Sequence, residues 1–317
     1  MKSLMLFGII GVFTSFSSFQ LGCAQSVAES KNSNPSSLVN STTNKPPDHI
    51  TEGVLEDVNI FEALNVNLSE VLNENTIGES KANKKGQSIG VRQLDIEQAP
   101  YHVALFQDNY FVCAASIISS DWIVTAAHCV YGGGTFGIRF GTTDCRKGGR
   151  IRHITTVVIN SRFKIASLDN DIALLRLNKP FRWSSSVQPL SLPAERLKFP
   201  RKSLISGWGS IEENNVPKSF GAVEVNAIPR SACRKEYSNA INITKNMICA
   251  KSSGTQACQA DSGSPLVRRG ILYGIVTFDS DCGRSNSPAI YTDVRKQCKW
   301  IRNVVRHHGG EQPVIVT

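Results

Sequence analysis

The stretch FVCAASIISSDWIVTAAHC, residues 111–129, carries the pattern that decides the fold. Two short apolar runs, rich in β-branched residues, stand on either side of the polar residues Ser119 to Asp121. Many short strands without long helical patterns between them favour an all-β barrel or sandwich. Similar runs recur later in the chain, separated by turn residues: ITTVVI, IALLRL, SLISGWG, ILYGIVTF and AIYTDV. Only the end, DVRKQCKWIRNVVRHH, has helical periodicity, so we expect a β-rich domain with one C-terminal helix.

The first 24 residues have the features of a secretory signal. Lys2 is followed by an apolar run from Leu4 to Phe13, and the small residues Gly22 and Ala24 suit cleavage after Ala24. A membrane anchor would need about 20 apolar residues, and this run is far shorter. We therefore expect a signal peptide over residues 1–24, a secreted, extracellular protein, and no association with a membrane.

Residues 25–87 differ in composition from the rest of the chain. A Ser-, Asn- and Pro-rich linker precedes VLEDVNIFEALNVNLSEVLNEN, whose apolar residues recur at helical spacing. The whole region has a net charge of −4, whereas residues 88–317 have a net charge of +12. This asymmetry suggests an acidic pro-segment that packs on a basic domain, or attraction of that domain to acidic glycans, while charge kept for solubility explains it equally well.

Export favours oxidised cysteines, and eight of the nine remain once Cys23 is removed with the signal. Three sequons fit a secretory route and predict glycosylation at Asn40, Asn67 and Asn242. The chain has no P-loop, dinucleotide or CxxC motif, so we expect no cofactor and no nucleic-acid partner. We also expect no metal site, because His307 and His308 have no third ligand nearby and Asp144 alone is too little for a calcium loop.

Three polar residues stand in apolar or tight-turn surroundings. His128 follows WIVTAA, Asp171 precedes IALLRL, and Ser262 lies between Asp261 and Gly263. Each has an ordinary structural interpretation when taken alone. Together they supply a base, an orienting carboxylate and a nucleophile, which are the groups that acyl transfer through serine requires.

From Ser88 to about His308 the sequence resembles the trypsin-like serine proteases of the chymotrypsin fold. The matching stretches, in the family's order, are PYHVALF, CAASIISSDWIVTAAHC, DNDIALLRL, VQPLSLP, ISGWGS, CQADSGSPL and AIYTDV. The resemblance implies two packed six-stranded antiparallel β-barrels, with the active site between them, and a protease domain over residues 88–317.

The resemblance also implies roles for individual residues. His128 would take the proton of Ser262, and Asp171, rather than Asp169, would orient the imidazole. Backbone N–H groups of Ala260 and Ser262 would form the oxyanion hole. The implied disulfides are Cys113–Cys129, Cys233–Cys249 and Cys258–Cys282. Cys145 and Cys298 match no family pair, so they either join each other or leave one thiol reactive between chains.

The sequence departs from the family at the nucleophile and at the activation site. The usual GDSGGP reads ADSGSP, and Ala260 has less backbone freedom than glycine. The family's new amino terminus pairs with the aspartate before the nucleophile, here Asp261. A cleavage creates this new amino terminus. In this chain the cleavage would follow Gln87, or it would release Ile89 if the match to the family contains a one-residue gap. A cleavage after Lys85 would leave the new amino terminus too long to fit.

The implied substrate pocket also differs. Gln256 stands where trypsins carry an aspartate, and Thr277, Asp279 and Ala289 line the rest of the pocket. Without a carboxylate at its base, the pocket is not expected to be strictly specific for basic residues.

Two functions follow. The first is a secreted serine endopeptidase made as a zymogen, with protein or peptide substrates, an activating protease and protease inhibitors as partners. The alternative is a weak or inactive homologue that binds or regulates other proteins in a proteolytic cascade. The complete set of His128, Asp171 and Ser262 favours the first, and the lost glycines favour the second.

Overall fold

The computed structural model describes residues 92–209, 220–238, 240–252, 261–279 and 287–317. The predicted signal peptide and the predicted acidic pro-segment, including its stretch of apolar residues at helical spacing, lie outside these residues. So do Gln256, Cys258, Ala260 and Cys282.

The first barrel forms from the stretch that includes FVCAASIISSDWIVTAAHC. Its strands are all antiparallel and close in the order β2-β3-β4-β7-β6-β5. Trp122 and Ile123 of β4 are fully buried, as are Leu174 and Leu175 of the adjacent β7, and they form the centre of this barrel. The strands are β2 (His102–Gln107), β3 (Tyr110–Ile117), β4 (Trp122–Thr125), β5 (Phe136–Phe140), β6 (Arg150–Ile159) and β7 (Ala173–Leu177).

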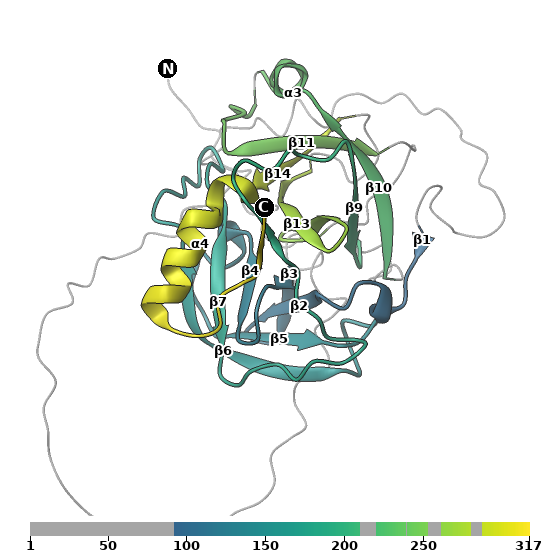
Figure 1. Ribbon diagram of the computed structural model, residues 1–317, viewed down its shortest axis with the longest axis vertical. Helices are drawn as coiled ribbons and strands as arrows, with labels where there is room; N and C mark the ends of the chain where they lie inside the picture. Colours follow the sequence, from purple (N-terminus) through teal and green to yellow (C-terminus); the bar gives the residue numbers. More distant parts are fainter. Residues whose placement is uncertain (1–91, 210–219, 239, 253–260, 280–286) are drawn as a thin grey trace, which may run out of the picture.

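The second barrel forms from the C-terminal half of the chain. It closes in the order β9-β10-β11-β14-β13-β12, and the short strand β1 (Arg92–Gln93) adds to β10. Its six strands are β9 (Lys202–Gly207), β10 (Gly221–Ile228), β11 (Met247–Ser252), β12 (Pro265–Arg268), β13 (Ile271–Phe278) and β14 (Ala289–Asp293). Figure 1 shows the two barrels, with β2 to β7 in one group and β9 to β14 in the other.

The C-terminal helix α4 (Val294–His308) begins after Asp293, whose side chain accepts a hydrogen bond from the Arg295 N–H. Its apolar face, including Ile301 and Val305, packs into the same buried cluster as strands of the first barrel. The chain then continues into β15 (Ile315–Val316), which pairs in parallel with β8 (Leu192–Pro193). The tail therefore ties the end of the chain to the segment between the barrels.

The predicted fold class is confirmed: the chain forms two six-stranded antiparallel barrels and a C-terminal helix. The structure also contains a short helix that the sequence did not indicate, α3 (Arg230–Glu236), which follows Pro229. This helix has only seven residues and one buried side chain, Cys233, so it leaves no apolar period in the sequence. Two 3₁₀ turns, Ile96–Gln98 and Ala127–Cys129, complete the described elements.

Within the described residues, no helix combines the length and the hydropathy needed to cross a bilayer.

Candidate active site

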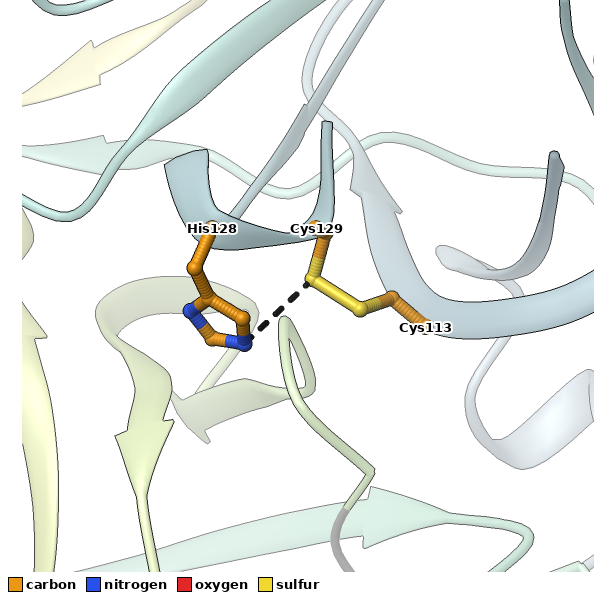
Figure 2. A group of neighbouring side chains, drawn as sticks. All are labelled: Cys113, His128 and Cys129. Atoms are coloured by element: carbon orange, nitrogen blue, oxygen red, sulfur yellow. Dashed lines mark hydrogen bonds between the residues drawn. A yellow bond between two sulfur atoms is a disulfide. The ribbon is translucent and has the colours of Figure 1, made fainter. Parts of the chain in front are cut away.

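His128 lies in the 3₁₀ turn that follows β4. The disulfide Cys113–Cys129 joins this turn to β3, so the residue beside His128 is covalently tied to the neighbouring strand. Figure 2 shows the imidazole next to the disulfide, with Nε2 3.8 Å from the Cys129 sulfur. The imidazole is partly exposed, which leaves it accessible to a reacting group.

Asp171 holds His128 through both carboxylate oxygens. One oxygen lies 2.7 Å from Nδ1 of the imidazole, and the other accepts the backbone N–H of His128 at 2.9 Å. Asp171 is fully buried, and Thr292 donates to its main-chain carbonyl. Burial lowers the pKa of His128, but the charge of Asp171 and its hydrogen bond outweigh this effect, so the pKa is raised overall. This arrangement stabilises an imidazolium and leaves Nε2 available for proton transfer.

Asp169, the other carboxylate of the DND stretch, has a different environment. It accepts hydrogen bonds from Thr244 Oγ1 at 2.5 Å and from Asn246 Nδ2 at 3.0 Å. These contacts join the loop before β7 to the loop before β11. The structure therefore gives the two neighbouring aspartates separate partners, with Asp171 on the imidazole and Asp169 on the second barrel.

Ser262 lies in a turn between β11 and β12 that is attached directly to the histidine region. Its main-chain carbonyl accepts a hydrogen bond from the Ala114 N–H at 2.9 Å. Ala114 follows Cys113, and the disulfide Cys113–Cys129 leads to the residue beside His128. Gly263 adopts a φ of +81°, and a Cβ there would overlap the Ala114 carbonyl and the Thr125 hydroxyl. Only glycine fits this position without moving β3.

Asp261 precedes Ser262 and accepts the backbone N–H of Trp208 at 3.0 Å. Burial raises the pKa of Asp261 to about 7, and the N–H groups of Trp208 and Gly209 offset only part of this effect. A carboxyl group with this pKa is partly protonated at neutral pH. A cation brought next to it would restore the charged form.

Ser264, which replaces the family's glycine, has a role that the sequence did not suggest. Its hydroxyl is fully buried and accepts the backbone N–H of Asp261 at 3.1 Å, while its own N–H donates to the Asp261 carbonyl at 2.9 Å. These two hydrogen bonds close the nucleophile turn on itself. The serine therefore adds a contact that glycine has no side chain to make.

The predicted pocket residues that the structure describes lie at adjoining strand ends. Thr277 is buried on β13, where its hydroxyl lies 2.9 Å from that of Thr292. Asp279 follows β13 and is partly buried, and Ala289 begins β14 and is also partly buried. Burial raises the pKa of Tyr291, and the charge of Asp279 raises it further.

The cysteines separate into bonded and free groups. The structure contains the disulfides Cys113–Cys129 and Cys233–Cys249, whereas the implied Cys258–Cys282 pair lies outside the described residues. Cys145 is disulfide-bonded, and Cys298 is a free, buried thiol that donates to the Pro193 carbonyl. A bridge between Cys145 and Cys298, one of the two possibilities left open, is therefore excluded. Burial of Cys298 also excludes it as a reactive thiol on the surface.

Cys113, His128 and Cys129 place three potential metal-binding atoms within 4.8 Å of one another. The two sulfurs are bonded to each other, as Figure 2 shows, so they are not the thiolates that bind metals.

Of the three predicted glycosylation sites, Asn242 is exposed, and Asn40 and Asn67 lie outside the described residues.

Comparison with known proteins decides the family. The family profile described as Trypsin matches residues 88–301. This chain belongs to the trypsin family of serine proteases. Trypsin alpha of Drosophila melanogaster is 33% identical over 221 residues, which cover 68% of this chain and 86% of that trypsin.

Solved structures agree with this trypsin-family assignment. Neuropsin, a serine protease expressed in the limbic system of mouse brain, matches with a TM-score of 0.60 and 29% identity, over 68% of this chain and 98% of neuropsin. An inactivated protease paralogue of the scabies mite, S-I1, matches with a TM-score of 0.61 over 69% of this chain and 99% of the paralogue. Its identity of 23% shows a shared fold alone.

Proposed function

We propose that this trypsin-family chain is a secreted serine endopeptidase that cleaves peptide bonds through an acyl-enzyme at Ser262. The observation that carries the proposal is the double hydrogen bond between Asp171 and His128, which fixes the imidazole with Nδ1 toward the carboxylate. His128 Nε2 then accepts the proton of the Ser262 hydroxyl as the serine attacks the carbonyl carbon. The same nitrogen returns this proton to the leaving amine.

The remaining groups stabilise charge that develops in the transition state. Backbone N–H groups of Ala260 and Ser262 would donate to the oxyanion, and each such donor contributes roughly a hundredfold to a thousandfold in rate. Asp171 stabilises the imidazolium that forms on His128. Ser264 supports this arrangement because it holds the N–H of Asp261, the residue between the two donors.

Activation would use the carboxyl group of Asp261. A cut after Gln87 would release residues 25–87, once the signal over residues 1–24 has been removed, and create a new amine at Ser88. Pairing with that amine would lower the pKa of Asp261 from about 7 and fix its charged form beside the nucleophile. This supports a zymogen in which the carboxyl group of Asp261 has backbone N–H partners at Trp208 and Gly209 but, among the described residues, no cationic one.

The substrates would be proteins or peptides without a strict requirement for a basic residue. Gln256 would stand at the base of the pocket, and the carboxylate of Asp279 would be close to its wall. A neutral base favours uncharged side chains, while Asp279 permits a basic one. The alternative of an inactive regulatory homologue is not favoured, because the chain retains all three residues of the proposed triad and matches a relative named as a trypsin.

The test is cleavage of a mixed peptide library by the purified chain after its mature amino terminus has been sequenced. We expect cleavage products with wild-type protein and none with Ser262→Ala. Sequencing of the products reports the preferred residue before the cut. Equal cleavage by both proteins would overturn the proposed nucleophile, because contaminating protease would then account for the products.

A further inference from the structure

Helix α4 buries one side-chain amide on a face that is otherwise apolar. Gln297 lies between Val294 and Ile301 and beside Cys298, and all four side chains are buried. A buried amide costs free energy unless its carbonyl oxygen and its NH₂ group both have hydrogen-bond partners. An apolar residue would suit this face of the helix better, so the amide of Gln297 marks a specific polar contact.

The partners of Gln297 are two asparagines of the first barrel. Its Oε1 accepts a hydrogen bond from Asn160 Nδ2 at 2.9 Å, and its Nε2 donates to Asn170 Oδ1 at 3.1 Å. Asn160 directly follows β6, Asn170 directly precedes Asp171, and both asparagines are buried. Gln297 therefore links helix α4 to the residue before the carboxylate that holds His128.

The contact belongs to a closed ring of hydrogen bonds that passes through the main chain of Arg162. The Arg162 N–H donates to Asn160 Oδ1 at 3.0 Å, and the Arg162 carbonyl accepts from Asn170 Nδ2 at 3.3 Å. Asn170 Nδ2 also donates to Asp169 at 3.1 Å. The NH₂ group and the carbonyl oxygen of Asn170 thus all have partners, and each bond in such a ring polarises the next.

Asn170 determines how the main chain presents Asp171. Its φ is +56°, in the left-handed region, which asparagine adopts more readily than most residues. The N–H of Ile172 donates to the Asn170 carbonyl at 2.8 Å, so Asp171 is the central residue of a three-residue turn. Leu168 also has a positive φ, of +54°. Such backbone conformations persist only where surrounding contacts hold them, and the ring through Gln297 supplies these contacts.

The side chain of Asp171 depends on this turn for its orientation. Both carboxylate oxygens bond to His128, one to Nδ1 and the other to the backbone N–H. The main chain of Asp171 is held on one side by Thr292, which donates to its carbonyl at 2.8 Å. On the other side it is held through Asn170, so the ring is the second of two supports for the carboxylate.

We propose that Gln297 is a positioning residue for Asp171 that acts through the side chain of Asn170. The inference rests on the proposed function, in which Asp171 orients His128 for proton transfer. Without the Gln297 amide, Asn170 Oδ1 loses its donor and the turn at Asp171 gains freedom. The carboxylate then spends less time in the geometry that fixes the imidazole, and proton transfer slows.

The pKa of His128 reports how well Asp171 is held. Burial lowers this pKa, whereas the charge and the hydrogen bond of Asp171 raise it. The other charged groups on the segments around His128 are exposed or have hydrogen-bond partners of their own: Asp169, Asp261, Arg162 and Lys164. A loosened Asp171 therefore lowers the pKa of His128, which a general loss of stability does not do.

The test compares Gln297→Met, Asn170→Gly and the double variant with the wild-type chain. Methionine is unbranched and similar in length to glutamine but forms neither hydrogen bond, and glycine permits the φ of Asn170 without its side chain. Val305→Ala is the matched control, because it removes buried apolar atoms from α4 and leaves the ring intact.

Each purified chain is studied after its mature amino terminus has been sequenced. Thermal melting reports stability, and steady-state kinetics on a peptide substrate report kcat and KM. NMR titration of histidine-labelled protein reports the pKa of His128, whose signal is assigned by its loss in His128→Ala.

In Gln297→Met we expect kcat to fall about tenfold with KM unchanged, and the pKa of His128 to fall by about half a unit to one unit. Asn170→Gly should give a comparable loss. The double variant should lose little more, because Gln297 acts through Asn170. Val305→Ala should melt at a lower temperature but keep the wild-type kcat and the wild-type pKa of His128.

An unchanged kcat and an unchanged pKa of His128 in Gln297→Met would overturn the positioning role. Equal losses in Val305→Ala, or fully additive losses in the double variant, would also overturn it. If Gln297→Met does not fold, Gln297→Asn replaces it with the same expected loss, because its amide is one methylene too short to reach both asparagines.

The NMR titration separates this inference from the proposed function. A wild-type chain that cleaves no peptide and is not labelled at Ser262 would contradict the proposed function. The pKa of His128 in Gln297→Met would still fall, or fail to fall, and so decide the role of Gln297.

Discussion

The His128–Asp171 pair and the Ser262 turn form the two halves of the candidate active site, and they are held in different ways. In the first barrel, one buried carboxylate uses both oxygens on the same histidine, next to a disulfide. In the second barrel, the Ser262 turn is fastened by main-chain hydrogen bonds to β3 and β13 and by the Ser264 hydroxyl. The first half retains the family's residues, while Ala260 and Ser264 both fall in the second. The level of activity should therefore be set mainly by the geometry of the turn.

The largest effect should come from breaking the first half. Asp171→Asn would remove the negative charge and present an amide to Nδ1, so the imidazole would favour the wrong tautomer. We expect kcat to fall by about 10⁴-fold with little change in KM. Steady-state kinetics on a peptide substrate measure this change. Asp169→Asn is the matched control, because that carboxylate binds Thr244 and Asn246 instead, and a comparable loss there would contradict the separation of roles.

A methyl group at Gly263 should break the second half. In Gly263→Ala the Cβ would collide with the Ala114 carbonyl and the Thr125 hydroxyl, which forces Ser262 away from β3. We expect activity to fall by roughly a hundredfold or more, equivalent to loss of an oxyanion donor. Gly270→Ala is the control, because Gly270 also has a positive φ but an open surrounding. Equal losses in the two variants would show that backbone strain, and not this contact with β3, is responsible.

Removal of the Ser264 hydroxyl should have a smaller effect. Ser264→Ala leaves the Asp261 N–H without its acceptor, and a hydrogen bond of this kind contributes about 0.5–1.5 kcal/mol, or roughly twofold to thirteenfold in rate. The loss should appear in kcat and leave KM unchanged, because the turn positions the nucleophile and does not contact the substrate side chain. Ser203→Ala is the control, since its buried hydroxyl has no hydrogen-bond partner among the described residues. A rise in KM alone would argue against a positioning role.

The smallest expected effect is a change in the pH dependence of kcat/KM, which distinguishes the two halves of the site. The neutral form of His128 is the base, and its pKa is raised by Asp171, so kcat/KM should increase with pH through a midpoint above the ordinary value of 6.5. Asp171→Asn should move this midpoint down. Ser264→Ala should lower the plateau and leave the midpoint in place. A midpoint that moved in both variants would mean that the turn also sets the charge of the histidine.

Local sequence patterns and family motifs predicted most of the fold and one part of the candidate site. Short β-branched runs predicted an all-β barrel or sandwich, and the resemblance to the family implied the two barrels. The period of Val294, Cys298 and Ile301 predicted α4, because this pattern follows directly from which side chains are buried. The choice of Asp171 over Asp169 rested on the resemblance to the family, and the structure shows the former on the imidazole. The strands and α4 could be predicted because they depend on local sequence pattern, and Asp171 could be predicted because the family's motifs occur in the same order along this chain.

Features that depend on contacts between distant strands were not predictable. In the sequence Ser264 is a missing glycine, and only the folded turn shows its hydroxyl on the Asp261 N–H. Thr292 donates to the Asp171 carbonyl across 121 positions of sequence, and no spacing rule indicates such a pair. Cys298 is likewise a free thiol buried against the Pro193 carbonyl, which the cysteine count did not show.

The most direct test of the central claim, that Ser262 is a nucleophile activated by His128, is labelling with a fluorophosphonate probe. The wild-type chain, sequenced at its mature amino terminus, is compared with Ser262→Ala and His128→Ala, and the modified residue is located by peptide mass spectrometry. We predict a covalent phosphonyl adduct on Ser262 that disappears in the first variant and forms at least about a thousandfold more slowly in the second. Correctly processed wild-type protein that remains unlabelled, or that is labelled equally fast without His128, would contradict the claim.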